Sequence, residues 1–280
     1  MSDLTCDVCF HHCVLKEGKT GRCRTRSNVN GENRSINYGK VTSLGMDPIE
    51  KKPLVRFHPG SYILSCGFFG CNFACPFCQN WEIAQAGAAD VGWQEATPEA
   101  LVALGERLHA KDPRMIGIAH TYNEPLVSWE FVRDTALLAR EAGLATVLVS
   151  NGCATAEVVD ALAPLVDTAN IDLKSFSPAF YEECGGSLEL AQATIQRLAA
   201  EPGCHLEVTT LVVNGKNDTP AEMDELAAWL ASVDPGIVLH VTRFFPRWKL
   251  TDRLATPVRR VYELADVARR HLSHVHVGNC

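Results

Sequence analysis

The stretch Cys71-Asn72-Phe73-Ala74-Cys75-Pro76-Phe77-Cys78 directly follows an apolar run at residues 62–65, and it determines the fold that we predict. Its three thiols, spaced four and three residues apart, can converge on one cubane iron–sulfur cluster. A [4Fe–4S] cluster takes four ligands, and this stretch supplies three. One iron is then open to a ligand from outside the protein. Two other interpretations stay open: three reduced, buried thiols, or a zinc site that lacks one ligand.

Beyond residue 61 the chain alternates short aliphatic or β-branched runs with helical segments. The runs fall at residues 62–65, 115–119, 146–150, 168–172, 205–213, 238–242 and 274–277. Helix starts are indicated by Thr97-Pro98, Thr219-Pro220 and Thr256-Pro257, where a capping residue precedes a proline. This alternation is typical of a parallel sheet with right-handed crossovers. Six such units plus one strand are too few for an eight-stranded barrel, so the predicted fold is α/β, a partial, open-sided (β/α)6 barrel.

The bulk composition limits the classes of protein to consider. The chain has 280 residues, 46% hydrophobic and 21% charged, which is enough for a large core. A formal charge of −7 and the lack of a basic run argue against nucleic acid as a partner. The polar start and the lack of a long apolar run predict no membrane partner and a cytoplasmic location. Twelve cysteines in such a protein indicate metal or redox chemistry rather than disulfides.

A second group of cysteines lies near the amino terminus, spaced Cys6-x2-Cys9-x3-Cys13-x9-Cys23. Four thiolates fit a closed tetrahedral zinc site, which would fold a segment with little core of its own. The same thiols could hold a second iron–sulfur cluster, or form a cysteine-rich strap without metal. The charged, proline-bounded run at residues 47–54 indicates a solvated connecting strap. We therefore expect residues 1–60 to be a cysteine-rich extension and strap, and residues 61–280 to be the barrel.

Polar residues follow every predicted strand. In barrels of this kind the active site lies at the carboxyl ends of the strands. The segments at those ends are the cysteine loop, His120 to Pro125, Asn151-Gly152-Cys153, Asp172-Leu173-Lys174, Asn214 to Asn217, Arg243 to Lys249 and Gly278-Asn279-Cys280. Any one of them could be ordinary loop chemistry. Seven in register predict a functional site at this edge of the sheet.

The Cys-x3-Cys-x2-Cys spacing of residues 71–78 resembles the signature of the radical SAM superfamily. The resemblance implies a [4Fe–4S] cluster held by Cys71, Cys75 and Cys78, with S-adenosylmethionine on the open iron. One electron from the reduced cluster would cleave the C5′–S bond, giving methionine and a 5′-deoxyadenosyl radical. The resemblance also implies a reductant such as a flavodoxin or ferredoxin as a partner.

Tyr122-Asn123-Glu124-Pro125 lies where the superfamily has its GGE-like element, which binds the amino group of the methionine moiety. The resemblance therefore assigns Asn123 and Glu124 to the cofactor, because a desolvated ammonium needs a carboxylate or carbonyl acceptor. An alternative is that Glu124 is a carboxylate at a helix start, interacting with the helix dipole.

Further candidates for the cofactor lie at the next strand ends. Ser150 and Asn151 can offer hydrogen bonds to its ribose or carboxylate, and Lys174 can neutralise that carboxylate. Asp172 could hold Lys174 or a monovalent cation, although the two could equally form a structural ion pair at the barrel rim. His120 could be a proton donor or substrate ligand, but a single histidine at a strand end is more often satisfied by hydrogen bonds. No catalytic residue is assigned.

Within the superfamily, residues 61–250 resemble the pyruvate formate-lyase activating enzymes. The closer resemblance is to the radical SAM enzymes of the AmmeMemoRadiSam system. It is carried by the amino-terminal cysteines, residues 47–54, Phe57 to Ser61, Cys71 to Asn80, Tyr122 to Pro125 and Phe244-Phe245-Pro246. Thr209 and Trp248 stand where the activating enzymes have Arg and His, and Val149 stands where they have Asp. These departures put the cation site and a glycyl-radical substrate in doubt.

The leading functional hypothesis is a radical SAM oxidoreductase that abstracts a hydrogen atom from an unidentified substrate, which could be a protein or peptide. A glycyl-radical enzyme activase is the alternative within the class. The alternative from another class is a non-catalytic iron–sulfur electron carrier. A carrier would complete the cluster with a fourth cysteine, and Cys66 is the nearby candidate. Cys280 could be a thiol presented to the cavity or a remnant without a role.

Overall fold

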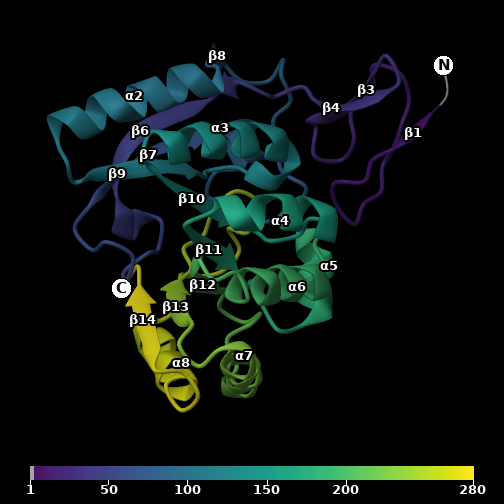
Figure 1. Ribbon diagram of the computed structural model, residues 1–280. Helices are drawn as coiled ribbons and strands as arrows, with labels where there is room; N and C mark the ends of the chain where they lie inside the picture. Colours follow the sequence, from purple (N-terminus) through teal and green to yellow (C-terminus); the bar gives the residue numbers. More distant parts are fainter. Residues whose placement is uncertain (1–2) are drawn as a thin grey trace.

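The apolar runs form the strands of one sheet, in a computed structural model that describes residues 3–280. Seven strands lie parallel in the order β14-β13-β12-β11-β10-β9-β7, and β6 pairs antiparallel with β7 at the edge. Their bounds are β6 (Ser43–Pro48), β7 (Tyr62–Gly67), β9 (Met115–His120), β10 (Ala145–Ser150), β11 (Thr168–Asp172), β12 (His205–Val212), β13 (Val238–Arg243) and β14 (His274–Gly278). The predicted α/β fold of six strand–helix units and a last strand is confirmed (Figure 1).

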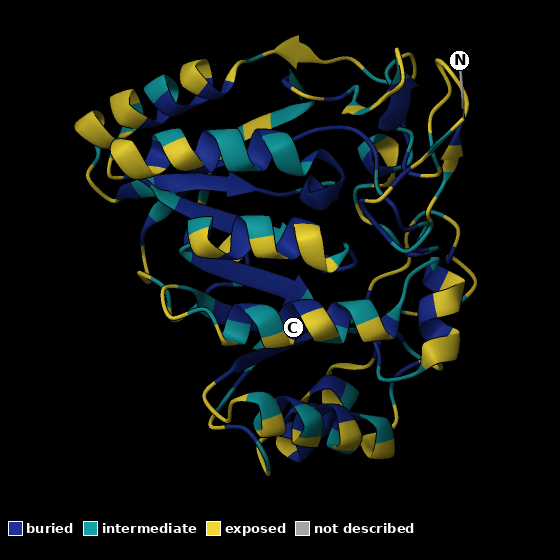
Figure 2. Ribbon diagram, turned by 45° about the vertical axis from the view of Figure 1, so that its right-hand side comes forward, coloured by how far each residue is buried: buried dark blue, intermediate teal, exposed yellow. Residues whose placement is uncertain are grey.

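Helices connect the parallel strands and cover one face of the sheet. They are α1 (Trp81–Ala84), α2 (Pro98–Lys111), α3 (Trp129–Glu141), α4 (Ala156–Leu162), α5 (Pro178–Cys184), α6 (Leu188–Ala199), α7 (Pro220–Val233) and α8 (Val258–Ala268). Figure 2 shows buried strands behind helices whose outward sides are exposed. The hydroxyls of Thr97 and Thr219 cap α2 and α7 as predicted. The Thr256 prediction is wrong, because its hydroxyl instead donates to Val212 O at 2.6 Å and α8 begins at Val258 without a side-chain cap.

Successive residues of the strands point to opposite faces of the sheet, and apolar and polar side chains lie on different faces. Val208 and Leu239, on β12 and β13, belong to the core beneath the helices. Their neighbours along the strands, Thr209 and His240, are paired across the same two strands and point to the opposite face. The inner face of the sheet is therefore polar over several strands, whereas the helix-covered face is the core.

The segment after β6 closes one end of the inner face. Ile49 and Leu54 are fully buried in a small cluster with residues 63, 119 and 147. Lys52 is also buried, with its Nζ 2.8 Å from Asp47 Oδ2. The prediction of a solvated strap is wrong, because residues 47–54 include two core residues and an ion pair with a buried lysine.

The amino-terminal segment forms two small hairpins and a short third pairing beside the sheet. They are β1 (Leu4–Thr5) with β2 (Val14–Leu15), β3 (Arg26–Val29) with β4 (Glu32–Ser35), and β5 (Lys40–Val41) with β8 (Gln94–Glu95). The hairpins are held to the barrel by Arg26, whose Nη1 lies 2.8 Å from Glu130 Oε2 on α3. Three single 3-10 turns complete the structure at Ile49–Lys51 (η1), Pro125–Ser128 (η2) and Ala163–Leu165 (η3).

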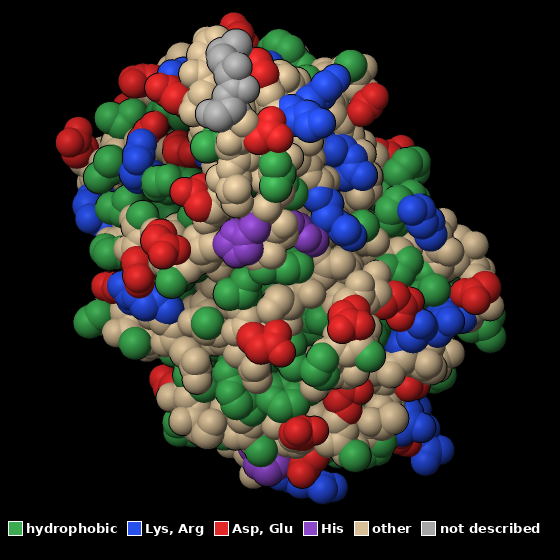
Figure 3. All heavy atoms as spheres, turned by 90° about the vertical axis from the view of Figure 1, so that its right-hand side faces the viewer, with side chains coloured by type: hydrophobic (Ala, Val, Ile, Leu, Met, Phe, Trp, Pro, Cys, Tyr) green, Lys and Arg blue, Asp and Glu red, His purple; other side chains and the backbone are tan. Residues whose placement is uncertain are grey.

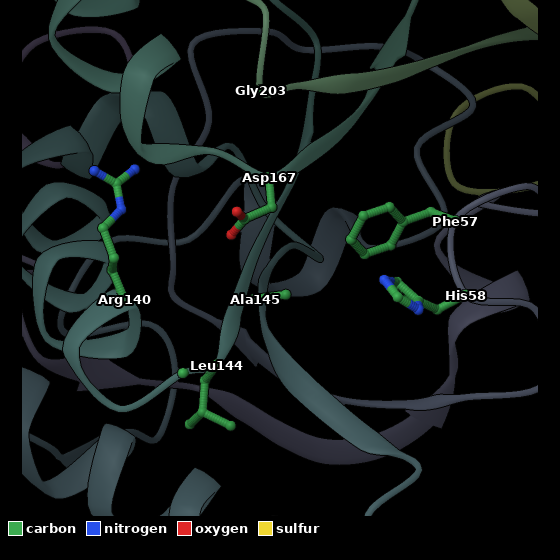
Figure 4. Close-up of a pocket in the computed structure, with 8 residues that line it drawn as sticks. Phe57, His58, Arg140, Leu144, Ala145, Asp167 and Gly203 are labelled. Atoms are coloured by element: carbon green, nitrogen blue, oxygen red, sulfur yellow. The ribbon is translucent and has the colours of Figure 1, made fainter.

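The amino-terminal ends of the strands carry a surface pocket of about 360 Å³. Figure 4 shows Asp167 between Arg140 on one side and Phe57 and His58 on the other. Asp167 Oδ2 accepts a hydrogen bond from Thr146 N at 2.7 Å, so this carboxylate ties neighbouring chain segments together. The pocket lies at the opposite edge from the cysteine loop. In residues 3–280 no helix has the length and apolar character to cross a membrane.

Candidate functional site

The loop between β7 and α1 holds the three cysteines of the motif. Cys75 is buried, and Cys71 and Cys78 are half-buried. Burial raises the pKa of Cys71, and the nearby Glu124, Cys75 and Cys78 raise it further. Burial and the charge of Cys75 likewise raise the pKa of Cys78 to about 11. Thiols whose charges act on one another in this way lie close together, as a shared cluster requires.

Aromatic side chains surround these thiols on the side of α5. Phe77 packs against the rings of Phe180 and Phe244, with centroids 5.9 Å and 6.5 Å away. Phe73 packs edge-on against Tyr181. A Cβ at Gly186 would lie 2.2 Å from the Phe73 ring, so only glycine permits this close approach. The loop thus has an apolar wall on the side of α5, which shields the buried Cys75 most completely.

Hydrogen bonds join the cysteine loop to the ends of β9 and β10. Asn151 Nδ2 donates to Asn72 Oδ1 at 2.9 Å and lies 3.8 Å from Cys71 Sγ. Glu124 accepts from Ser150 Oγ at 2.7 Å and from Asn151 N at 2.8 Å. Three of the predicted cofactor residues, Glu124, Ser150 and Asn151, therefore lie together beside the motif.

Glu124 lies at a helix start, which is the alternative considered for it from the sequence, and it also lies beside the cysteine motif. It is the N-cap residue of η2, and its Oε1 accepts from Leu126 N at 3.0 Å. Burial raises its pKa to about 7, although hydrogen bonds from Asn151, Ser150 and Leu126 oppose the rise. Its Oε2 accepts from Asn151 N and keeps a lone pair for a further donor.

Asn123 holds the backbone that leads into the cysteine loop. Its Oδ1 accepts from Phe68 N at 3.0 Å, and its Nδ2 donates to Gly70 O at 3.0 Å. Its amide group is thus occupied by the loop itself, and its contacts here are those of a residue that positions the loop.

Asp172 and Lys174 form an ion pair at the end of β11, with Nζ and Oδ2 2.8 Å apart. Burial alone would lower the pKa of Lys174, but Asp172 and Cys75 together raise it above its usual range. The ammonium group therefore stays charged next to the cysteine motif. The predicted pairing with Asp172 is present, and it places a cation near Cys75.

Comparison with known proteins identifies the family. The family model described as the Radical SAM superfamily matches residues 67–230. The chain belongs to the radical SAM superfamily. An uncharacterized protein of Methanocaldococcus jannaschii is 38% identical over 279 residues, which are 98% of this chain and 80% of that protein.

Solved structures share the fold of this radical SAM protein. A domain of the pyruvate-formate lyase-activating enzyme from Bacteroides vulgatus is 21% identical, with a TM-score of 0.50 over 59% of this chain and 99% of that domain. Streptococcus suis SuiB bound to its precursor peptide SuiA is 12% identical, with a TM-score of 0.59. That match covers 83% of this chain and 51% of SuiB, so the chain spans about half of that protein. At these identities the likeness concerns the fold alone.

Membership in the radical SAM superfamily implies a [4Fe–4S] cluster, S-adenosylmethionine and an external reductant. The donor set fits, because three thiols of one loop converge and Phe73 N donates to Cys71 Sγ at 3.3 Å. In residues 3–280 no three His, Cys, Asp or Glu side chains are closed around the position of a single ion. A cubane needs no such arrangement, because each thiolate binds a different iron.

One further thiol of this radical SAM protein adjoins the motif, and sequence reasoning missed it. The hydrogen bond that the Cys75 thiol donates to Cys184 is the largest cause of the raised pKa of Cys75. The backbone joins the same regions, since Ala74 N donates to Cys184 O at 2.8 Å. Cys66 instead lies in the core cluster beneath α2 and α3. Cys184, at the end of α5, is therefore the structural candidate for a fourth ligand.

His120 faces the helices and is not part of the radical SAM site. It is paired with Cys66 and Leu148, which lie in the core, and its ring packs near Phe131. Neither ring nitrogen has a hydrogen-bond partner, and burial lowers its pKa to about 4. Both sequence-based interpretations of His120 are wrong, because it neither faces the site nor is satisfied by hydrogen bonds.

The inner face of the radical SAM barrel carries a polar group that the sequence analysis did not single out. Glu207 accepts from His240 Nε2 at 2.5 Å and His205 Nε2 at 3.0 Å. It also accepts from the backbone amides of residues 55 and 56 at 3.1 Å and 2.9 Å. Thr209, one of the departures from the activating enzymes, donates to Asn170 Oδ1 on this face. The alternation of polar residues at 205, 207 and 209 was the signal available in the sequence.

The loop after β13 covers the cysteine motif from the other side. The backbone amides of Lys249 and Leu250 both donate to Pro76 O at 3.0 Å. Trp248, the second departure, stacks on Trp81 with ring centroids 6.0 Å apart. This indole pair borders the radical SAM site at the exposed end of the motif.

Proposed function

We propose that this chain is a radical SAM oxidoreductase that cleaves S-adenosylmethionine reductively and abstracts a hydrogen atom from a substrate. The observation that carries the proposal is the convergence of three loop thiols next to the Glu124–Ser150–Asn151 network, with Asn151 reaching Cys71. Such a loop leaves one iron without a ligand from the motif, beside a carboxylate that can accept from an ammonium.

The residues have distinct roles in this proposal. Cys71, Cys75 and Cys78 hold the cluster, which when bound supplies the electron that breaks the C5′–S bond. Glu124 and Asn123 serve the amino group, Glu124 through the free lone pair of Oε2 and Asn123 by positioning the loop. Ser150 and Asn151 hydrogen-bond the ribose or carboxylate.

The ion pair of Lys174 with Asp172 brings a positive charge toward the carboxylate of S-adenosylmethionine. Phe73 and Phe77 exclude water from the thiols and so shield a radical from solvent. Together these side chains bind, orient and shield, while the hard chemistry belongs to the cofactors.

The polar inner face favours a substrate rich in hydrogen-bonding groups. Thr209, His240 and Thr242 share this face on neighbouring strands. We propose a peptide or protein segment as substrate, entering beside the Trp81–Trp248 pair, with a flavodoxin- or ferredoxin-type protein as reductant. The motif matches to the AmmeMemoRadiSam enzymes support a place in that branch.

Anaerobic reconstitution tests the proposal. The cluster-loaded protein is reduced with dithionite in the presence of S-adenosylmethionine, and 5′-deoxyadenosine is measured by mass spectrometry. We expect product from the native protein and none from Cys71→Ala. A protein that holds four irons and yields no 5′-deoxyadenosine would contradict the proposal.

A second candidate function, an iron–sulfur electron carrier, is favoured by the position of Cys184. A thiol beside Cys75 could complete the cluster and leave no iron open. Cys184→Ser separates the two functions, because it should cost the cluster of a carrier at least one iron and leave that of the enzyme intact.

A further inference from the structure

The four amino-terminal cysteines converge in the structure, although they belong to different turns. Asn33 Nδ2 donates to Cys6 Sγ at 3.4 Å, and Asn33 Oδ1 accepts from Arg26 Nε at 3.1 Å. The backbone N of the same Arg26 donates to Cys23 Sγ at 3.4 Å, so Cys6 and Cys23 lie on either side of one arginine. The shared position follows from the hairpins, since Cys6 N donates to Cys13 O at 2.9 Å. Four thiols from 18 residues of chain thus lie in one region, although among residues 3–280 no three of them are closed around the position of a single ion.

Hydrogen-bond donors point at each of these sulfur atoms. Arg22 N donates to Cys13 Sγ and Arg26 N donates to Cys23 Sγ, both at 3.4 Å. Backbone hydrogen bonds also run from Val8 to Cys6 and from His11 to Cys9. Backbone N–H groups directed at sulfur stabilise thiolate, the form that binds metal.

Side-chain donors add to this pattern. Thr25 Oγ1 donates to Cys23 Sγ at 3.2 Å, and Asn33 Nδ2 donates to Cys6 Sγ at 3.4 Å. The donors come from both strands of the β3–β4 hairpin and from the turn before it. The second hairpin is therefore arranged around the sulfur atoms.

The segment has no apolar core of its own, because its buried Val8 and Leu15 belong to the main core of the barrel. Its first strands are two residues long, and several of its buried side chains are polar: Thr25, Arg26, Ser27, Asn28 and Asn37. Val14, one of its few aliphatic residues, is 66% exposed. Figure 3, which looks onto the side of the molecule that carries this segment, shows side chains of both charges there. A segment of this composition needs a cross-link that hydrophobic burial does not supply.

The segment also packs directly against the radical SAM motif. His11 Nε2 lies 2.9 Å from Asn72 O, within the motif. Gly70, the residue before Cys71, has a φ of +89°, and a Cβ there would lie 2.5 Å from Cys23 O. Asn37 Nδ2 donates to Phe69 O at 2.7 Å. The two groups of cysteines are therefore joined through the backbone of residues 69–72.

We propose that Cys6, Cys9, Cys13 and Cys23 bind one tetrahedral divalent ion of the zinc class, which fixes the segment against residues 69–72. The spacings Cys6-x2-Cys9 and Cys9-x3-Cys13 are those of zinc-binding turns. Binding converts the thiols to thiolates and releases their protons to solvent, without any change in oxidation state. Backbone hydrogen bonds already hold the four cysteines in one region. On binding, the ion brings their sulfur atoms to coordination distance.

Metal analysis of a variant that lacks the other motif tests this inference independently of the proposed function. The variant Cys71→Ala/Cys75→Ala/Cys78→Ala is purified without iron reconstitution, and zinc, iron and acid-labile sulfide are measured. We expect one zinc per chain and no sulfide. Stoichiometric iron with sulfide would overturn the single-ion site in favour of a second cluster, and a folded protein without bound metal would overturn the site altogether.

X-ray absorption at the zinc edge of the unaltered protein avoids any effect of substitution on folding. We expect four sulfur neighbours at about 2.3 Å. A shell of nitrogen and oxygen atoms would overturn the inference. In the same three-alanine background, Cys23→Ser should lose the zinc, whereas the control Cys204→Ser should keep it. Retention of zinc in a folded Cys23→Ser protein would also overturn the inference.

Discussion

The two groups of cysteines differ in number and in surroundings. The motif at residues 71–78 has three thiols on one loop, walled by aromatic rings and open to a network of polar residues at the strand ends. The amino-terminal group has four thiols on separate turns, with hydrogen-bond donors on every sulfur atom and no apolar core apart from that of the barrel. In the proposed function the first group leaves a coordination position free, whereas in the proposed metal site the second has enough ligands to close one.

The difference indicates that one chain can use one group of cysteines for catalysis and another to stabilise its fold. A site with a missing protein ligand can bind a small molecule at its metal, as catalytic metal sites do. A site with four thiolates cannot, and its binding energy becomes folding energy instead. Residues 69–72 contact the amino-terminal segment and lead into the cysteine motif. A metal ion in that segment would therefore also stabilise the loop of the motif.

Cys75→Ala gives the largest expected effect on this comparison. Loss of the buried thiol removes one of only three protein ligands, so the cluster should be lost. We expect formation of 5′-deoxyadenosine to fall by at least about 1000-fold, which corresponds to about 4 kcal/mol in the activation barrier. Iron content and product are measured on the same sample. Wild-type product from the alanine variant would show that the motif does not hold the cluster.

Cys23→Ser tests the second group through stability. Removing one of four thiolates should release the ion and cost about 3–5 kcal/mol, comparable with the loss of a buried cross-link. Thermal unfolding, with Cys204→Ser as the matched control, measures the change. Equal unfolding temperatures for the two variants would remove the structural role given to the amino-terminal group.

Much of the fold and part of the site could be predicted from the sequence. The seven parallel strands follow from apolar runs and helix caps. The positions of Ser150 and Asn151 beside the motif follow from their places at a strand end, whereas Glu124 was assigned from the resemblance to the superfamily. Cys184 could not be found this way, because only the packing of the end of α5 against the cysteine loop places it beside Cys75. Ile49 and Leu54 were missed because the charges around them dominate the local pattern.

Glu124→Gln sharpens the claim that the first group is open to an external ligand. The amide keeps the shape but loses the charge that attracts an ammonium group. We expect the dissociation constant for S-adenosylmethionine to rise about 10- to 100-fold, the value of a hydrogen bond to a charged group. Equilibrium binding to the cluster-loaded protein measures it. The control is Glu82→Gln on the exposed side of α1, which should bind like the native protein. Unchanged affinity in Glu124→Gln would exclude the proposed contact.

Glu207→Gln measures how much a buried polar cluster without cysteine contributes to the free energy of unfolding, for comparison with Cys23→Ser. Burial would raise the pKa of Glu207, but hydrogen bonds from His205, His240 and the amides of residues 56 and 55 lower it from 4.5 to about 2. Its stabilisation is therefore complete above about pH 4.5 and is lost as the pH falls toward 2.

We expect Glu207→Gln to cost about 1–3 kcal/mol at pH 7, and less at about pH 3, with the metal content unchanged. Urea unfolding at the two pH values measures the difference. A cost that grows on acidification would contradict the assigned direction of the pKa shift.

Cys184→Ser should have the smallest effect, although its thiol is the neighbour of Cys75. If the fourth iron is open, the serine variant keeps four irons and its rate of 5′-deoxyadenosine formation stays within about twofold of the native rate. Iron analysis and product measurement are made together. Loss of one iron in this variant would indicate that Cys184 completes the cluster.

The most direct measurement is the electron paramagnetic resonance of the reduced, cluster-loaded protein before and after addition of S-adenosylmethionine labelled with ¹⁵N in its amino group. A ligand on the free iron should change the cluster signal and introduce a coupling to the labelled nitrogen. A signal that stays unchanged and shows no nitrogen coupling would mean that the protein itself fills the fourth position.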